Sequence, residues 1–240
     1  FTLGSGASLR GAGSFVDSGS AVTIDLGFET RTWAGSNNGV WDGNTTANWQ
    51  EGDSLFFDGD NVIFDDTLTG NSLINLSGNI QAGSITFNNN STAYTLEFDT
   101  DELSVMSGLV HSGNASATIN TNVGTIVGGI LASGAGDLVI GGNVSEIDGI
   151  RVTSAGGFTL SAGSSISNLT GTLNLEGSGN ATLSGTIGGT GSFTKSGSGT
   201  TTLNGTNSYT GNTTMTGGIL RVGGTDAIGD SSVVNQTGGT

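Results

Sequence analysis

Polar and apolar residues alternate over short stretches of the chain, and each stretch ends at a small turn. In the C-terminal half, the apolar residues that close these stretches recur at intervals of 20, 23, 20 and 19 residues. Alternation with a period of two is typical of strands that bury one face. No window shows the i, i+3, i+4, i+7 spacing of an amphipathic helix, so the pattern predicts an all-β fold. The recurring residues are Ile140, Leu160, Leu183, Leu203 and Val222.

This interval fits one coil of a parallel β-helix, because three short strands and three turns use roughly 20 to 25 residues at about 3.3 Å per strand residue. Glycine and asparagine recur at the expected corners, where a positive φ is needed. We therefore predict a right-handed, single-stranded parallel β-helix (β-solenoid) over residues 1–240, as a segment of a longer rod. The five recurring residues should form one stacked core column. An antiparallel sandwich or barrel, which also has frequent turns, is the alternative.

The composition agrees with a thin, repetitive core. The chain has 45 glycines, no proline and no cysteine. Proline removes a donor from a strand ladder, so its absence is compatible with continuous strand pairing. The lack of cysteine excludes disulfides, thiolate metal sites and a cysteine nucleophile. We expect no cofactor.

The charge is strongly acidic, with 20 acidic and five basic residues and a formal net charge of −15. The five cations are too few and too scattered to form the basic stripe of a nucleic-acid-binding protein. The same balance disfavours binding to an anionic membrane. No apolar run reaches the 18 residues of a membrane-spanning helix, and no signal peptide is visible at Phe1. The basic residues are Arg10, Arg31, Arg151, Lys195 and Arg221.

Residues 189–223 contain an ordered set of short motifs: Lys-x-Gly-x-Gly, a Thr-x-Leu strand, Asn-x-Tyr-x-Gly, a second Thr-rich strand and Gly-Gly-x-Leu-x-Val. This order resembles the autotransporter-associated β-strand repeat of bacterial passenger domains. Residues 33–96, which are punctuated by tryptophans, resemble the segment that often precedes such repeats. The lysine of the repeat, Lys195, is expected to snorkel at a corner. Tyr209 should cover one end of a coil with its hydroxyl exposed, and Asn204 and Asn207 should form ladders with equivalents in adjacent coils.

The resemblance implies a passenger domain that is exported through the outer membrane to the bacterial cell surface, with the β-helix as a stalk or scaffold. Its neighbours would be further coils of the same longer chain. The first hypothesis is therefore a structural segment, not an enzyme, that displays or spaces an adhesive region. The second is an adhesin whose side face binds carbohydrate or host and matrix partners. A glycan-degrading β-helix enzyme is the third hypothesis, and rods that associate side by side are a further expectation.

Three tryptophans, Trp33, Trp41 and Trp49, lie eight residues apart. One interpretation is a hydrophobic plug within a bulging early coil. The other is a set of exposed rings that stack on sugars, so these residues are the candidates for ligand contact.

Two short motifs point to hydrolytic chemistry. Gly52-Asp53-Ser54-Leu55 resembles the tag of a lipase and esterase family, and Asp17-Ser18-Gly19-Ser20 resembles the nucleophile loop of serine proteases. The esterase mechanism needs a histidine base. The resemblance implies that this histidine lies three residues after an aspartate, but the residue three before His111 is Gly108. No histidine precedes the second motif, as the chymotrypsin-type order requires. We expect neither motif to be catalytic.

Two acidic clusters are dense enough to suggest calcium, which prefers six to eight oxygen ligands. Solvated turns are the alternative interpretation, and we predict no metal site. The clusters are Asp58, Asp60, Asp65 and Asp66, and then Glu97, Asp99, Asp101 and Glu102.

Overall fold

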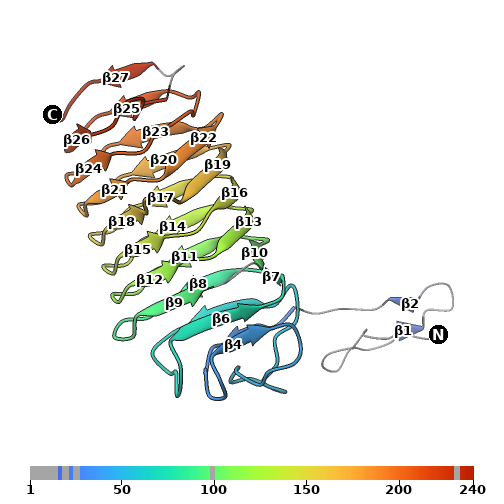
Figure 1. Cartoon of the computed structure of the whole chain (residues 1–240). Helices are drawn as coiled ribbons and strands as arrows, with labels where there is room; N and C mark the ends of the chain where they lie inside the picture. The colour runs from blue at the N-terminus through green and yellow to red at the C-terminus, as the bar shows by residue number, and fades with distance from the viewer. Residues whose placement is uncertain (1–15, 18–21, 24–27, 98–100, 230–232) are drawn as a thin grey trace.

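The computed structural model describes residues 16–17, 22–23, 28–97, 101–229 and 233–240. From Thr30 onward, the described chain winds as a β-solenoid in which strands of successive coils pair in parallel (Figure 1). The described residues contain no helix, and thus none that would span a bilayer. The parallel β-solenoid prediction is confirmed, and the antiparallel alternative is excluded.

Three parallel sheets form the sides of the solenoid. The ten-stranded sheet contains β3 (Thr30–Thr32), β5 (Asn61–Phe64), β8 (Ile85–Phe87), β11 (Leu109–His111), β14 (Ile130–Ala132), β17 (Ile150–Val152), β20 (Thr172–Leu175), β23 (Ser192–Lys195), β25 (Thr213–Met215) and β27 (Val234–Gln236). The nine-stranded sheet contains β4 (Val40–Asp42), β6 (Leu73–Ser77), β9 (Tyr94–Glu97), β12 (Ala117–Ile119), β15 (Leu138–Ile140), β18 (Phe158–Leu160), β21 (Ala181–Leu183), β24 (Thr200–Leu203) and β26 (Ile219–Val222). The six-stranded sheet contains β7 (Ile80–Ala82), β10 (Glu102–Val105), β13 (Asn122–Ile126), β16 (Val144–Ile147), β19 (Ser165–Leu169) and β22 (Thr186–Gly189).

One pair of strands lies outside this arrangement. β1 (Val16–Asp17) and β2 (Val22–Thr23) pair antiparallel and form a separate two-stranded sheet. This pair differs from the prediction of one continuous solenoid over residues 1–240. Antiparallel strands can be joined by a short connection, whereas parallel strands need a long crossover.

The predicted column of apolar residues lies in register on β15, β18, β21, β24 and β26. Ile140 pairs with Leu160, Leu160 with Leu183, Leu183 with Leu203, and Leu203 with Val222. The first four are at most 1% exposed, but Val222 is 52% exposed. Its assignment to the core is therefore corrected. β26 is the last strand of its sheet, so no further coil among the described residues covers this side chain.

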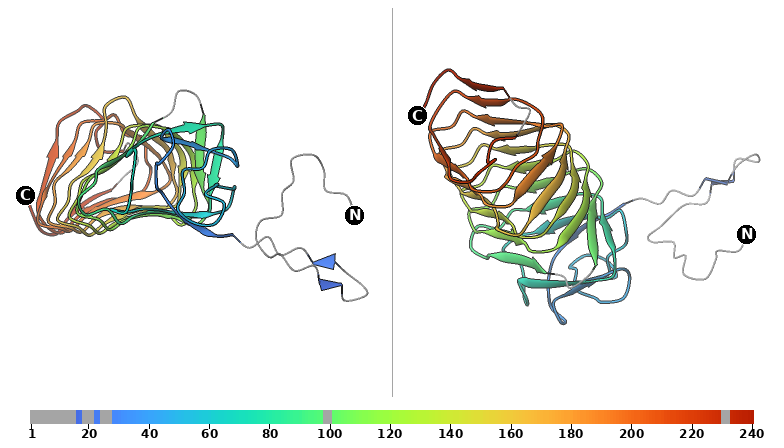
Figure 2. Two further views of the ribbon diagram at one scale, coloured as in Figure 1. Left: turned by 90° about the horizontal axis from the view of Figure 1, so that it is seen from below. Right: turned by 45° about the horizontal axis from the view of Figure 1, so that its top comes forward.

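Stacked glycines form the corners between the ten-stranded and nine-stranded sheets. A Cβ at Gly156 would lie 2.1 Å from the carbonyl oxygen of Gly136, and one at Gly179 would lie 1.9 Å from that of Gly156. A Cβ at Gly199 would lie 2.1 Å from the Gly179 oxygen. Here the requirement for glycine is the close approach of one coil to the next, and Figure 2 shows how closely the coils follow one another.

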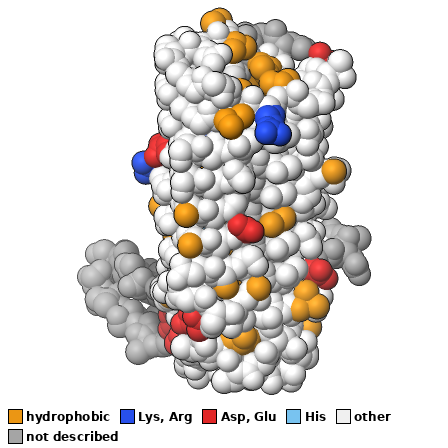
Figure 3. All heavy atoms as spheres, turned by 90° about the vertical axis from the view of Figure 1, so that its left-hand side faces the viewer, with side chains coloured by type: hydrophobic (Ala, Val, Ile, Leu, Met, Phe, Trp, Pro, Cys, Tyr) orange, Lys and Arg blue, Asp and Glu red, His pale blue; other side chains and the backbone are white. Residues whose placement is uncertain are grey.

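A row of threonines, interrupted by Val139, lies on the outward face of the nine-stranded sheet. These β-branched side chains suit an exposed strand face, and Figure 3 shows a face of the rod with few charged side chains. The face in Figure 3 therefore carries few charges, although the whole chain has a net charge of −15. The threonines in register are Thr95 and Thr118, and then Thr159, Thr182 and Thr202.

Candidate functional site

The three tryptophans pack together at the N-terminal end of the solenoid. Trp33, Trp41 and Trp49 are 0%, 0% and 2% exposed. The Trp49 ring lies edge-on to the other two, with ring centroids 5.1 Å from Trp33 and 5.4 Å from Trp41. Phe56, 5.2 Å from Trp41, and Phe64, 5.8 Å from Trp41, complete the cluster.

This burial corrects the hypothesis that the tryptophans contact a ligand, because none presents a free ring face. The structure instead has the hydrophobic plug of the first interpretation. The chain turns between the tryptophans: Trp41 lies in β4, while Trp33 and Trp49 form an isolated antiparallel bridge. Their even spacing therefore does not reflect one continuous strand.

A buried arginine fastens the loop between β4 and β5 to the first coil. Arg31 is 1% exposed and forms ion pairs with Glu29, with Asp53 at 3.4 Å and with Asp60 at 3.5 Å. Its Nη1 also donates to the carbonyl of Glu51. Sequence reasoning missed this role. The available signal was a single cation among several carboxylates in a segment whose aromatic residues must be covered.

The acidic residues of the first cluster act as hydrogen-bond acceptors for the backbone. Asp60 accepts from the N–H groups of Glu29 and Phe57 at 3.0 and 3.2 Å. Asp66 accepts from the N–H groups of Ser91 at 2.9 Å and Asn90 at 2.8 Å, and these bonds lower its pKa to about 2. Such bonds stabilise the ionised carboxylate.

In the second cluster, Asp101 accepts from the N–H of Gly78 at 2.8 Å, in a neighbouring coil. Asp99 lies outside the described residues. Across the part of the chain that the structure describes, no three His, Asp or Glu side chains converge as metal ligands do.

The structure does not bring the esterase-like residues together with His111. Ser54 lies in the loop between β4 and β5, where its N–H donates to the Glu51 carbonyl. This loop is held against β3 by the ion pair between Arg31 and Asp53. His111 lies in β11, and two strands, β5 and β8, stand between β3 and β11 in the sheet. Of the second motif, Asp17 lies in β1, and Ser18, Gly19 and Ser20 lie outside the described residues.

His111 points into the core and is 0% exposed. Its Nε2 donates to the Ala115 carbonyl at 2.9 Å, while its Nδ1 has no hydrogen-bond partner. Burial lowers the pKa of the imidazole, although the Ala115 bond and the Asp137 charge act in the opposite direction. The ring is therefore a neutral core residue, packed 6.4 Å from the Phe87 ring.

We expect His111 to make the solenoid sensitive to mild acid. In the unfolded chain the imidazole has a pKa near 6.5, and in the folded chain its pKa is lower. Below about pH 6.5 the unfolded state binds more protons than the folded state does. The free energy of unfolding therefore decreases as the pH is lowered, by up to about 1.4 kcal/mol per pH unit. A His111→Leu variant should lose this component, measured as the difference between the two proteins in urea midpoint at pH 7 and pH 5. Equal pH dependence in the two proteins would contradict the assignment.

The lysine of the repeat is buried, which corrects the expectation that it snorkels. Lys195 is 1% exposed and lies on the inward face of β23. Its Nζ donates to the Gly197 carbonyl, and a Cβ on Gly218 would come within 2.6 Å of this nitrogen. Burial lowers the pKa of the ammonium group. Lys195 thus bonds to the corner of its own coil, and the glycine at position 218 of the next coil leaves room for its ammonium group.

The asparagines and the tyrosine of the repeat bond within the solenoid. Asn207 accepts from the N–H of Ile187 at 2.8 Å and donates to the Ala227 carbonyl at 2.6 Å, so it bridges the coils on either side. The predicted asparagine ladder is therefore replaced at Asn207 by bonds to backbone. Tyr209 is 1% exposed, and its hydroxyl shares a 2.8 Å hydrogen bond with Thr213. The predicted exposure of this hydroxyl is wrong.

Asn204 also contacts its neighbouring coil through the side chain. Its Nδ2 donates to the Ser184 hydroxyl at 3.3 Å. The loop after β24 carries Asn207 and Tyr209 over the edge of β22, where the backbone N–H of Ser208 donates to the Ile187 carbonyl at 2.8 Å. The loop thereby satisfies part of a strand edge that would otherwise be exposed.

Residues 193–222, which run from β23 to β26, match the family model of the passenger-associated-transport-repeat. This match confirms the resemblance identified in residues 189–223. No curated protein and no solved structure matches the chain significantly.

Proposed function

We propose that this chain is a stalk that holds an adhesive region away from the bacterial surface. Its passenger-associated repeat and its parallel coils fit the β-helix of an autotransporter passenger. The repeat and the solenoid support a passenger scaffold in general. Display of an adhesive region, exposure outside the outer membrane and a structural, non-enzymatic role are the finer parts of the proposal.

The observation that carries the proposal is the inward use of the repeat's polar residues. Three of these residues are at most 2% exposed and form their hydrogen bonds inside the solenoid: Lys195, Asn207 and Tyr209. Side chains that serve recognition or catalysis have to reach a ligand. Asn207 joins the coils on either side of it, while Lys195 and Tyr209 bond within their own coil. All three side chains therefore serve the solenoid itself, which is the task of a stalk.

A stalk made of stacked coils has a length proportional to its number of coils, at roughly 4.8 Å per coil. Each coil contacts only its neighbours, so coils can be removed as whole units. Ile130 and Ile150 occupy equivalent positions in successive coils. Deleting residues 130–149 therefore removes one coil and keeps the register, whereas deleting 130–139 breaks it.

We predict that the full chain, with an N-terminal epitope tag and the outer-membrane translocator of a characterised autotransporter, displays the tag on intact cells. The whole-coil deletion should be displayed with the same resistance to added protease. The half-coil deletion should be degraded, because its strands cannot pair with both neighbouring coils. Antibody binding to intact cells, followed by protease treatment, measures both outcomes.

Two results would contradict the proposal. The first is detection of the tag only after the cells are lysed, although the translocator is present in the outer membrane. This result would contradict export of the segment. Equal protease resistance of the two deletions would oppose a coil-by-coil stalk.

A further inference from the structure

A shallow groove lies on the outer face of the ten-stranded sheet, across β14, β17 and β20. Its volume is about 590 Å³, and it is open to solvent. Leu131, Arg151 and Asn174 lie in register on the three strands, and Asp148 and Thr172 line the adjoining corner. Three coils extend over roughly 10 Å along the rod, at about 4.8 Å per coil.

The groove has fixed polar groups. Arg151 forms a two-point contact with Glu176, through Nε at 3.1 Å and Nη2 at 2.7 Å, while its side chain remains 59% exposed. Asp148 is held by a 2.8 Å bond from the N–H of Gly128. Asn174 donates to the same Glu176 carboxylate and so helps to hold it beside Arg151.

Apolar side chains adjoin these polar groups on one side. Leu131, in the groove, is half-buried, and so is Val110, its register partner on β11. The outward row thus changes from apolar on β11 and β14 to polar on β17 and β20. A ligand that fits this groove must have an apolar face next to hydrogen-bonding groups.

The charges determine which ligand of this kind is favoured. Glu176 neutralises Arg151, and Asp148 adds a negative charge. The whole chain carries a net charge of −15, which repels polyanions over long range. A neutral ligand rich in hydroxyl groups meets these conditions.

We propose that this groove binds a neutral oligosaccharide. The C–H face of a sugar ring packs against Leu131 and Val110, and its hydroxyl groups bond to Arg151 and Asp148. This inference goes beyond the stalk function and does not depend on it. It also places sugar contact on a face that contains none of the tryptophans.

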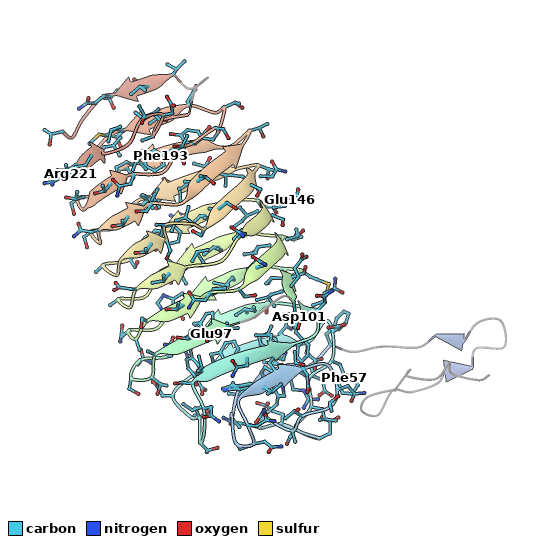
Figure 4. All side chains as sticks on the ribbon, in the orientation of Figure 1. Phe57, Glu97, Asp101, Glu146, Phe193 and Arg221 are labelled. Atoms are coloured by element: carbon cyan, nitrogen blue, oxygen red, sulfur yellow. The ribbon has the colours of Figure 1, made fainter. Side chains whose placement is uncertain are left out.

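The test uses the full 240-residue chain on an array of neutral and sialylated glycans, followed by calorimetric titration with the best neutral oligosaccharide. Arg151→Met should weaken binding at least about tenfold, because hydrogen bonds from charged groups contribute more than neutral ones. Arg221→Met is the matched control, since Arg221 is exposed on β26, near the C-terminal end of the rod (Figure 4). It should leave the affinity unchanged.

A second variant, Asp148→Asn, should also weaken binding while its thermal unfolding stays close to that of the wild type, because the amide oxygen can still accept from the N–H of Gly128. This comparison separates loss of the site from loss of the fold. The proposal is overturned if no neutral glycan binds at millimolar concentration, if sialylated glycans bind better than neutral ones, or if Arg151→Met binds as the wild type does.

Discussion

Replacing Gly179 with alanine is expected to lower the free energy of unfolding by about 3 kcal/mol, which is the upper part of the usual range for overpacking. The new Cβ would lie 1.9 Å from the carbonyl oxygen of Gly156 in the coil below. That oxygen belongs to the backbone, so relief of the clash requires two coils to separate. The separation would stretch the adjacent ladder between β18 and β21.

Gly43→Ala is the matched control, because no atom lies within 4 Å of a Cβ at that position. It should change the free energy of unfolding by no more than about 0.5 kcal/mol. Urea unfolding followed by circular dichroism measures both variants. Gly156→Ala, in the same column, should behave as Gly179→Ala does. Unchanged urea midpoints for both column variants would refute the role of the glycine stack.

Replacing Trp41 with alanine is expected to cost about 3–5 kcal/mol, the usual range for removal of a large buried aromatic side chain. Trp41 is 0% exposed and contacts the rings of Trp49, Phe56 and Phe64. The cavity would open beneath the loop between β4 and β5, at the end of the rod near Phe57 in Figure 4. The Trp41→Phe variant should lose less free energy of unfolding, because it keeps an aromatic ring in the cluster.

The measurement is the urea midpoint, together with acrylamide quenching of the remaining tryptophans, which should become more accessible. Val127→Ala is the control, since Val127 is 48% exposed and its truncation opens no cavity. If Trp41→Ala abolished glycan binding and left the urea midpoint unchanged, the ligand-contact hypothesis for the tryptophans would be reinstated.

The candidate site was less predictable than the fold. The repeat motif around Lys195 was recognisable from its spacing, but its spacing does not show on which side of a corner the ammonium group lies. Burial of Lys195 depends on Gly218, which comes from the following coil and leaves space for the nitrogen. The role of Arg31 likewise depends on carboxylates that folding brings from 20 or more residues away, such as Asp53 and Asp60.

The sequence by itself determined the fold class and the register of the C-terminal coils. Strand side chains alternate between faces, so a shift of one residue would expose the column from Ile140 to Leu203, and the apolar spacing therefore specifies the pairing. Only the tertiary structure decided that the tryptophans form a plug, that Val222 lies on the last strand of its sheet among the described residues, and that Leu131, Arg151 and Asn174 line one groove. Each of these depends on which coil covers which, and that contact joins residues a whole coil apart in the chain.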